Sequence, residues 1–173
     1  ALKKISKKRN LIIRDIGFIQ KKLHELLGKN LNDFQLKNLA MAISAAKICK
    51  VSEKKIFSSL IRIKSVNGRL ELVRTFPDDI KVYVDFAHTP DALSKSIKSL
   101  KGDENKNISV VFGCGGNRDF KKRPLMAKIA SSNCDKIYVT DDNPRNEKPE
   151  KIREVIIKNV KNINCYNIAN RAK

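Results

Sequence analysis

The sequence predicts an α/β fold whose second half forms a Rossmann-like, doubly wound and mainly parallel sheet. Two observations support this prediction: short apolar runs alternate with helical segments, and the runs are apolar throughout rather than at every second residue. Strands of that composition are typical of parallel sheets, because helices cover both faces of such a sheet. Turn residues rich in Gly, Asp and Asn separate the elements, as expected for this fold class.

We place a domain boundary near residues 66–69, which gives an incomplete domain at 1–66 and a second domain at 67–173. The second domain opens with two strand-like runs at 70–76 and 81–86, joined by the turn Pro77-Asp78-Asp79. A helix then begins with Thr89 as N-cap and Pro90 at the first position, and it ends at Gly102. The later elements are predicted as strands 108–112, 137–140 and 164–168, and as helices that begin at 124 and span 150–160.

The first domain gives weaker signals. Residues 38–49 are rich in Ala with apolar residues at helical spacing, and a second helix follows Ser52, a candidate N-cap, as far as Ile61. Residues 11–13 look like a strand, whereas 19–27 fit either a helix or an irregular strand. Periodicity alone leaves that choice open.

The chain is strongly basic, with 37 Lys and Arg against 18 Asp and Glu and a formal charge of +19. Such a charge favours polyanion binding. The excess is mostly Lys spread along the whole chain together with many Asn and Ile residues, a mixture that an A+T-rich genome would impose. Aromatic residues do not interleave with the basic runs 3–4, 7–9 and 121–123 as a base-stacking surface requires. A solvated basic surface is therefore favoured over a nucleic-acid interface.

The cysteines and histidines do not suggest a metal site. They are far apart, and no Cys-x-x-Cys pair occurs, so neither a zinc site nor a disulfide framework is expected. We expect buried free thiols in a reducing cytosol. No apolar run reaches the roughly 18–20 residues of a membrane span. The chain begins Ala-Leu-Lys-Lys without an initiator Met, which we interpret as an internal segment of a longer protein.

Three polar loops follow predicted strands, at 85–88, 113–123 and 141–145. Ligands bind at the carboxyl ends of parallel strands, so these loops should meet around one crevice. Guanidinium groups there suit carboxylate or phosphate, and carboxylates suit ammonium, so the set fits a zwitterionic amino acid. The residues expected to gather are Asp85, His88, Arg118, Asn143 and Arg145.

Each feature also has a purely structural explanation. Gly113-Cys114-Gly115-Gly116 lacks the Gly-x-Gly-x-x-Gly spacing and fits a tight strand-to-helix turn equally well. His88 fits a helix start, and 142–144 is good turn sequence. Arg118 and 121–123 fit a solvated basic loop. None of these features carries a function by itself.

Taken in order, however, the motifs closely resemble the Mur ligase family, and within it the members that add diaminopimelate. The resemblance covers about residues 30–173 and rests on VNGRLE at 66–71, VDFAHTPDAL at 84–93, FGCGGNRD at 112–119, KRPLM at 122–126 and TDDNPR at 140–145. It implies an ATP- and Mg²⁺-dependent ligase of peptidoglycan synthesis. Such an enzyme joins meso-diaminopimelate to UDP-N-acetylmuramoyl-L-alanyl-D-glutamate through an acyl phosphate.

The resemblance also implies roles for particular residues. Those expected in catalysis and ATP binding are Arg69, Asp85 and His88, with Gln35 and Asn38 near the adenine. Those expected to bind diaminopimelate are Arg118, Asn143, Pro144 and Arg145. The fork of Arg145 would clamp the distal carboxylate, which lysine lacks.

The sequence departs from the family in what it lacks. No Gly-x-x-Gly-Lys-Thr/Ser loop occurs, since Gly28-Lys29-Asn30 has no hydroxyl for Mg²⁺. The family's carbamylated lysine and its metal-binding Glu and His also have no match, so no metal ligand is assigned in this chain. The resemblance thus implies that 1–66 is the end of a central ATP-binding domain and 67–173 most of a C-terminal domain. We expect a monomer, and no turnover by this chain alone.

Three alternatives remain at this point. A ligase of the same family could add lysine or act on folates, although Asp142-Asn143-Pro144-Arg145 argues against both. A basic nucleic-acid-binding α/β module would show localised basic stripes and a steep salt dependence. A dinucleotide oxidoreductase would need the glycine fingerprint and an acidic residue about 20 positions later.

Overall fold

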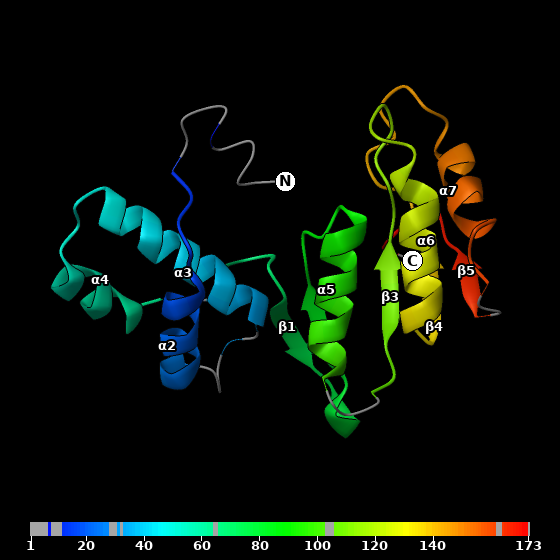
Figure 1. The fold of residues 1–173 in the computed structure, drawn as a ribbon. Coiled ribbons are helices and arrows are strands. Elements are labelled where there is room, and N and C mark those ends of the chain that lie inside the picture. The colour runs from blue at the N-terminus through cyan, green and yellow to red at the C-terminus, as the bar shows by residue number, and fades with distance from the viewer. Residues whose placement is uncertain are drawn as a thin grey trace. The chain divides into compact units, whose positions relative to one another are not determined.

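The computed structural model describes residues 7, 12–27, 31, 33–63, 66–102, 106–161 and 164–172. The chain divides into two compact units, Ala1–Lys64 (unit 1) and Ser65–Lys173 (unit 2). Unit 1 is helical in its described part, and unit 2 is mixed α/β (Figure 1).

Unit 1 contains α2 (Gly17–Leu27), α3 (Asp33–Ile48) and α4 (Glu53–Leu60), which bury Leu23, Leu36, Ala40, Ile43 and Ile56 between them. Ser52 caps α4 as predicted, because its hydroxyl accepts a hydrogen bond from the backbone N–H of Lys55 at 3.4 Å. The helix predicted from residue 38 begins earlier, at Asp33. An acidic residue there interacts favourably with the positive end of the helix dipole.

The strand expected at 11–13 is wrong where the structure describes it. Ile12 and Ile13 adopt no regular secondary structure and are 83% and 52% exposed; residue 11 lies outside the described residues, as do 28–30. A strand needs a partner for its backbone groups, and the described part of unit 1 contains no other strand. The choice left open at 19–27 is settled as the helix α2, which buries Leu23 against α3.

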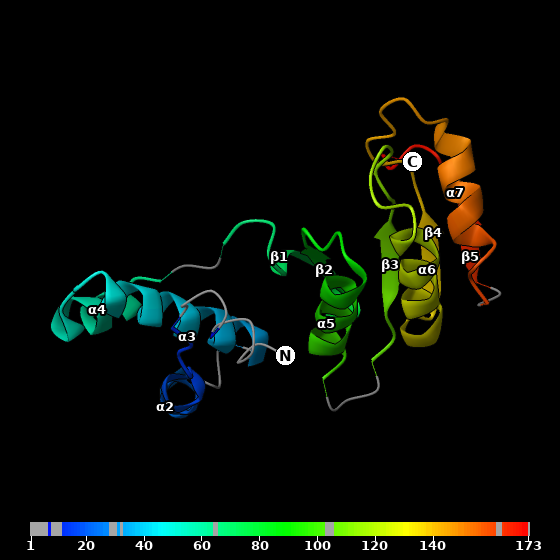
Figure 2. The ribbon, with the colours of Figure 1, turned by 45° about the horizontal axis from the view of Figure 1, so that its top comes forward.

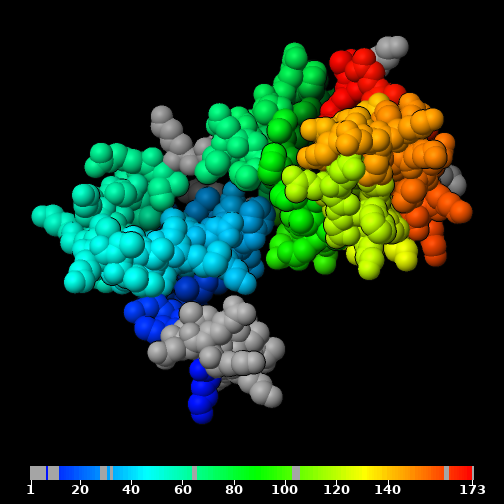
Figure 3. Space-filling view, turned by 90° about the horizontal axis from the view of Figure 1, so that it is seen from above, coloured from blue at the N-terminus to red at the C-terminus, as the bar shows by residue number. Residues whose placement is uncertain are grey.

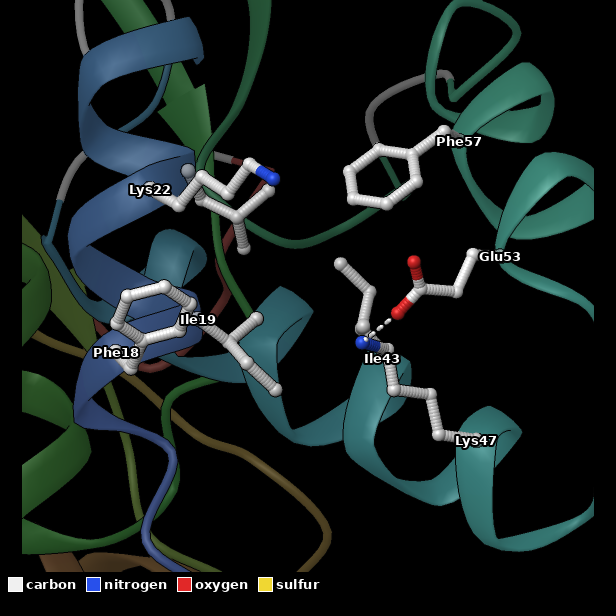
Figure 4. Close-up of a pocket in the computed structure, with 8 residues that line it drawn as sticks. Phe18, Ile19, Lys22, Ile43, Lys47, Glu53 and Phe57 are labelled. Carbon is white, nitrogen blue, oxygen red and sulfur yellow. Dashed lines mark hydrogen bonds and ion pairs between the residues drawn. The ribbon is translucent and has the colours of Figure 1, made fainter.

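Unit 1 also contains a partly open pocket of about 120 Å³ between its helices (Figure 4). An ion pair between Lys47 Nζ and Glu53 Oε1, 2.5 Å apart, lies at its edge, and Lys22 Nζ lies 5.3 Å from the centre of the Phe57 ring. The lining residues are Phe18, Ile19, Lys22, Leu23, Ile43, Lys47, Glu53 and Phe57.

Unit 2 begins with the predicted hairpin. Strands β1 (Glu71–Thr75) and β2 (Lys81–Val84) pair antiparallel as a separate two-stranded sheet, joined by the short 3₁₀ turn η1 (Pro77–Asp79). Helix α5 (Pro90–Lys101) follows, and the Thr89 hydroxyl accepts from the N–H of Ala92 at 3.2 Å, as expected of an N-cap. Gly102 ends α5 with φ 57°, a conformation that favours glycine.

The parallel sheet consists of β3 (Ser109–Phe112), β4 (Lys136–Val139) and β5 (Cys165–Asn167), in the order β3-β4-β5. Helices α6 (Lys122–Asn133) and α7 (Pro149–Ile157) connect consecutive strands (Figures 1 and 2). The alternation of strands and helices predicted for this half is therefore confirmed, with each boundary shifted by no more than a few residues.

Helices cover one face of this sheet in the described part of the chain. The strand order moves in one direction only, and right-handed crossovers then place α6 and α7 on the same face. Phe112, Ile137 and Val139 are buried on that face, whereas Val111 on the other is 54% exposed. The sequence predicted that helices cover both faces of the sheet. That prediction rested on the continuous apolar runs of the strands, and such runs do not show which face each helix occupies. None of the described helices combines the length and apolar composition needed to cross a membrane.

Candidate functional site

Two loops at the carboxyl ends of β3 and β4 pack directly against each other. The first covers residues 113–121 and the second 140–148, and both lie at the end of unit 2 seen in Figure 3. The backbone N–H of Gly116 donates to the carbonyl of Asn143 at 2.8 Å, and that of Asn146 donates to Asn117 Oδ1 at 3.0 Å. The predicted convergence of these two loops is therefore present.

Gly116 permits this close approach. A Cβ at this position would lie 1.9 Å from the carbonyl oxygen of Pro144, a distance that no side chain can occupy. The glycine is therefore required by the neighbouring backbone. This explains the Gly-rich sequence after β3 without any dinucleotide fingerprint.

Arg145 lies in the second loop with its guanidinium group turned toward the first. Its Nη1 donates to the carbonyl of Gly116 at 2.7 Å, and its backbone N–H donates to Asn143 Oδ1 at 3.3 Å. Arg145 adopts φ 50°, the left-handed region that non-glycine residues rarely occupy. Arg118 is exposed on the first loop and makes no hydrogen bond to another described residue. The two guanidinium groups thus belong to neighbouring, exposed positions on the packed loops.

The sequence reasoning missed an ion pair beneath these loops. Arg123 is only 5% exposed, and it donates from Nη1 and Nη2 to the two carboxylate oxygens of Glu147, both at 2.9 Å. The alternative of a solvated basic loop at 121–123 is wrong for Arg123. One signal was available: the helix dipole disfavours a cation in the first turn of a helix, so a carboxylate partner stabilises a buried arginine there.

The environment of Glu147 favours its ionised form. The Arg123 guanidinium, and after it the backbone N–H of Asn117 at 2.6 Å, hold the pKa of this carboxyl below its usual range. Glu147 therefore carries its charge at neutral pH.

Asp85, expected to bind nucleotide, is engaged in structural hydrogen bonds. Its Oδ1 accepts from the backbone N–H of Leu70 at 3.1 Å, and its Oδ2 accepts from the hydroxyl of Ser96 on α5. Ser96 is buried, and Asp85 is half-buried. The carboxylate thus ties the start of the hairpin to α5.

Arg69 and His88 meet at the ring of Phe86. The Arg69 guanidinium lies 4.6 Å from the centre of that ring, and the His88 ring packs edge-on at 5.3 Å. His88 Nδ1 is 3.0 Å from the carbonyl of Phe86. Both Arg69 and His88 are exposed, so the guanidinium and the imidazole form a surface cluster around one aromatic ring.

The two groups of loops are joined at the start of α6. Lys122 Nζ donates to the carbonyl of His88 at 2.9 Å, while Arg123 Nη2 donates to the carbonyl of Gly115 at 3.3 Å. The first turn of α6 therefore links the segment that carries His88 to the glycine loop, against which Arg145 packs. Among the described residues, Arg118 makes no hydrogen bond or ion pair with either. Gln35 and Asn38 lie in unit 1, three residues apart on α3 and so on one side of that helix.

The described residues give little support to a metal-binding site or to a nucleophilic thiol. No group of three His, Cys, Asp or Glu side chains there could hold a metal ion. None of the four cysteines forms a disulfide, and the expectation that they are buried is wrong for Cys49, which is exposed. Burial raises the pKa of the Cys134 thiol to about 11 and also raises that of Cys114, so neither is a ready nucleophile. The pocket of unit 1 contains none of the predicted site residues.

Comparison with known proteins adds independent information. The family model described as "Mur ligase, glutamate ligase domain" matches residues 68–173. UDP-N-acetylmuramoyl-L-alanyl-D-glutamate--2,6-diaminopimelate ligase of Rickettsia montanensis is 42% identical over 143 residues, which cover 82% of this chain and 29% of that protein. The enzyme of the same name from Rhizobium meliloti is 46% identical over 125 residues, which cover 72% of this chain and 26% of that protein.

Solved structures give the same fold. A structure of UDP-N-acetylmuramoyl-L-alanyl-D-glutamate--2,6-diaminopimelate ligase matches 80% of this chain and 28% of its own with 34% identity and a TM-score of 0.55. Folylpolyglutamate synthase from Thermotoga maritima matches 79% of this chain and 32% of its own with 23% identity and a TM-score of 0.54. The second likeness concerns the fold alone. Together they confirm the predicted Rossmann-like α/β class.

Proposed function

Because this chain belongs to the Mur ligase family, as its motifs predicted, we propose that it forms the amino-acid-binding part of an ATP-dependent ligase. The proposed reaction joins meso-diaminopimelate to UDP-N-acetylmuramoyl-L-alanyl-D-glutamate in peptidoglycan synthesis. The chain spans 29% of the length of the Rickettsia montanensis relative. We therefore propose the activity for a longer protein that contains this chain, and we expect no turnover by the 173 residues alone.

The observation that carries this proposal is the placement of Arg145. One nitrogen of its guanidinium donates to the carbonyl of Gly116, which fixes the orientation of the fork above the glycine loop. The remaining N–H groups can bind a carboxylate in the bidentate manner that arginine favours. Diaminopimelate has a distal carboxylate and lysine has none. A fork fixed in this position therefore supports diaminopimelate as the substrate.

Neighbouring residues complete the amino-acid site in this proposal. Asn143 supplies an amide beside Arg145, Pro144 shapes the turn that approaches Gly116, and Arg118 supplies a second exposed cation. The D-glutamate γ-carboxylate, activated as an acyl phosphate, loses phosphate when the amine of diaminopimelate attacks it. The contribution of these residues is to hold the carboxylates of the amino acid so that its amine is presented to that carbon.

ATP is the proposed source of the phosphoryl group, and the exposed Arg69–His88 cluster is the part of unit 2 suited to contact its phosphates. Asp85 would act there by fixing the hairpin against α5. Gln35 and Asn38 are proposed to approach the adenine with their amides. The described residues do not fit a Mg²⁺ site, so we assign the Mg²⁺ ligands to other parts of the longer protein.

We also propose a cytoplasmic location and a monomeric enzyme. The four cysteines form no disulfide, which fits a reducing compartment, and the reaction consumes ATP. Gel filtration of the longer protein would test the oligomeric state.

The test is ADP release by the longer protein with ATP, Mg²⁺ and the UDP-muramyl dipeptide, with meso-diaminopimelate or L-lysine added in parallel. We expect release that depends on diaminopimelate. Arg145→Ala should weaken its binding on the order of 10- to 100-fold, since a charge-assisted hydrogen bond is worth roughly 1.5–3 kcal/mol. The control Arg62→Ala removes an exposed arginine from unit 1 and should leave the amino-acid dependence unchanged.

Equal activity with lysine would retain the ligase and remove the proposed amino acid. The absence of release with either amino acid would reject the ligase. In that case the basic charge of the chain would become the main observation, and nucleic-acid affinity that falls steeply with salt would be the result to look for.

A further inference from the structure

We propose that the Arg123–Glu147 ion pair is the positioning element of the amino-acid site, and that it sets the affinity for the incoming amino acid without contacting it. This inference rests on the proposed ligase function and deepens it. Neither residue was among the predicted site residues. Glu147 lies in the loop that carries Asn143 and Arg145, and Arg123 lies in the first turn of α6 beside it.

The pair is built for rigidity. The two terminal nitrogens of Arg123 meet the two carboxylate oxygens of Glu147 at 2.9 Å each, a bidentate arrangement that fixes both side chains in one plane. The side chains are 6% and 34% exposed, so water screens the interaction far less than at an exposed pair. The Nε of Arg123 is buried without a partner in the described residues, so its stabilisation depends on the terminal nitrogens.

Both partners also bind the glycine loop. Glu147 Oε1 accepts from the N–H of Asn117 at 2.6 Å, and Arg123 Nη2 donates to the carbonyl of Gly115 at 3.3 Å. These contacts flank Gly116. The ion pair therefore holds the loop on both sides of the residue whose carbonyl receives Arg145.

Glu147 fixes the second loop as well. Its backbone N–H donates to the carbonyl of Pro144 at 3.0 Å, which closes the turn containing Arg145 in its left-handed conformation. One carboxylate thus connects the start of α6, the glycine loop and the turn of Arg145. If the carboxylate is lost, the backbone bond of Glu147 to Pro144 remains, but the turn of Arg145 loses its side-chain bonds to Asn117 in the glycine loop and to Arg123 in α6. The fork of Arg145 then moves relative to the bound amino acid.

A positioning residue affects one substrate more than another, whereas a general loss of stability does not. We expect Glu147→Gln and Arg123→Lys in the longer protein to raise the KM for diaminopimelate on the order of 10- to 100-fold, the cost of a small misplacement of a binding group. The KM for ATP should change less than about 3-fold. Glu147→Gln removes the charge, and Arg123→Lys removes the bidentate geometry. A similar rise in the KM for diaminopimelate in both variants would show that the ion pair, and not one of its residues alone, positions the site.

The matched control is Ile97→Val, which trims a buried side chain of α5 that takes no part in these loops. It should lower the melting temperature about as much as Glu147→Gln and Arg123→Lys do, and it should leave the KM for diaminopimelate unchanged. The inference is overturned if both variants leave that KM unchanged, or if they raise the KM for both substrates in the same proportion. If one variant does not fold, the other decides. Wild-type protein without amino-acid-dependent ADP release would instead reject the proposed function, and this inference with it.

Discussion

Different interactions stabilise unit 1 and unit 2. The described part of unit 1 packs three helices through aliphatic side chains, and its ion pair between Lys47 and Glu53 has side chains that are 40% and 67% exposed. Unit 2 buries two arginines, Arg123 and Arg153, each against a carboxylate. An exposed pair contributes little to stability, whereas a buried charge that loses its partner is left uncompensated.

The buried pairs of unit 2 lie where its loops leave the sheet. Arg153 pairs with Asp141 and also donates to Asn167 Oδ1 at 2.7 Å, which joins α7 to the loop after β4 and to the last residue of β5. Arg123 joins α6 to the loops of Gly115 and Glu147. Directional ion pairs therefore fix the loops that carry the candidate site. The described helices of unit 1 need only apolar contact, because their backbone groups are already satisfied within each helix.

The largest expected effect comes from truncating one buried isoleucine in the core of each unit. Ile137→Ala truncates a fully buried side chain between β3 and β5 and should destabilise unit 2 by about 4 kcal/mol, whereas Ile43→Ala in unit 1 should cost about 2 kcal/mol. Ile43 already borders a pocket, so truncation there removes fewer contacts. Hydrogen exchange of the amides in each unit measures both losses.

The control for this pair is Ile61→Ala, which removes a side chain that is 91% exposed and should change stability by less than about 0.5 kcal/mol. Equal costs at Ile43 and Ile137 would break the comparison, because they would show that unit 1 packs as tightly as unit 2.

The next effect separates close packing from backbone conformation at two glycines of unit 2. Gly116→Ala would bring a methyl group 1.9 Å from the carbonyl oxygen of Pro144, so the loops must move apart, at a cost of about 2–3 kcal/mol. Gly102→Ala meets no atom of another described residue, but it imposes φ 57° and ψ −154° on an alanine, a region that only glycine readily adopts, at a cost of about 1–3 kcal/mol. Denaturant unfolding of both variants gives the two costs.

Only Gly116→Ala should also weaken amino-acid binding, because only this variant displaces the carbonyl that orients Arg145. A Gly116→Ala protein with normal affinity would mean that contact between the loops does not position the site.

The smallest effect is the acid dependence of the two ion pairs. Arg123 lowers the pKa of Glu147, and Lys47 lowers the pKa of Glu53, in each case mainly through the side-chain hydrogen bond. A folded-state pKa below the ordinary 4.5 stabilises the protein above about pH 4.5. That stabilisation is lost as the pH falls through the lowered folded-state value.

Thermal unfolding between pH 7 and pH 3 measures this loss in wild type, Glu147→Gln and Glu53→Gln. We expect Glu147→Gln to remove more of the pH dependence than Glu53→Gln, and added salt to reduce the contribution of the exposed Glu53 pair first. A larger effect of Glu53→Gln would contradict the contrast between exposed and buried pairs.

Much of unit 2 could be predicted from the sequence because its signals are local. Thr89 and Pro90 mark the start of a helix, Gly102 marks its end, and Pro77-Asp78-Asp79 separates two strands. In each case the deciding interactions lie within a few residues. The strand expected at Ile12 and Ile13 failed for the opposite reason, since a strand exists only where another part of the chain pairs with it.

By itself, the sequence determined the family, the order of strands and helices in unit 2, and the loops that carry Arg69, His88, Asn143 and Arg145, because motif spacing and capping residues are properties of the chain alone. Only the tertiary structure decided that helices cover one face of the described sheet, that Asp85 binds Leu70 and Ser96, and that Arg123 is buried against Glu147. The physical reason is distance along the chain. Arg123 and Glu147 are 24 residues apart, and no local pattern shows which distant carboxylate will neutralise a buried arginine.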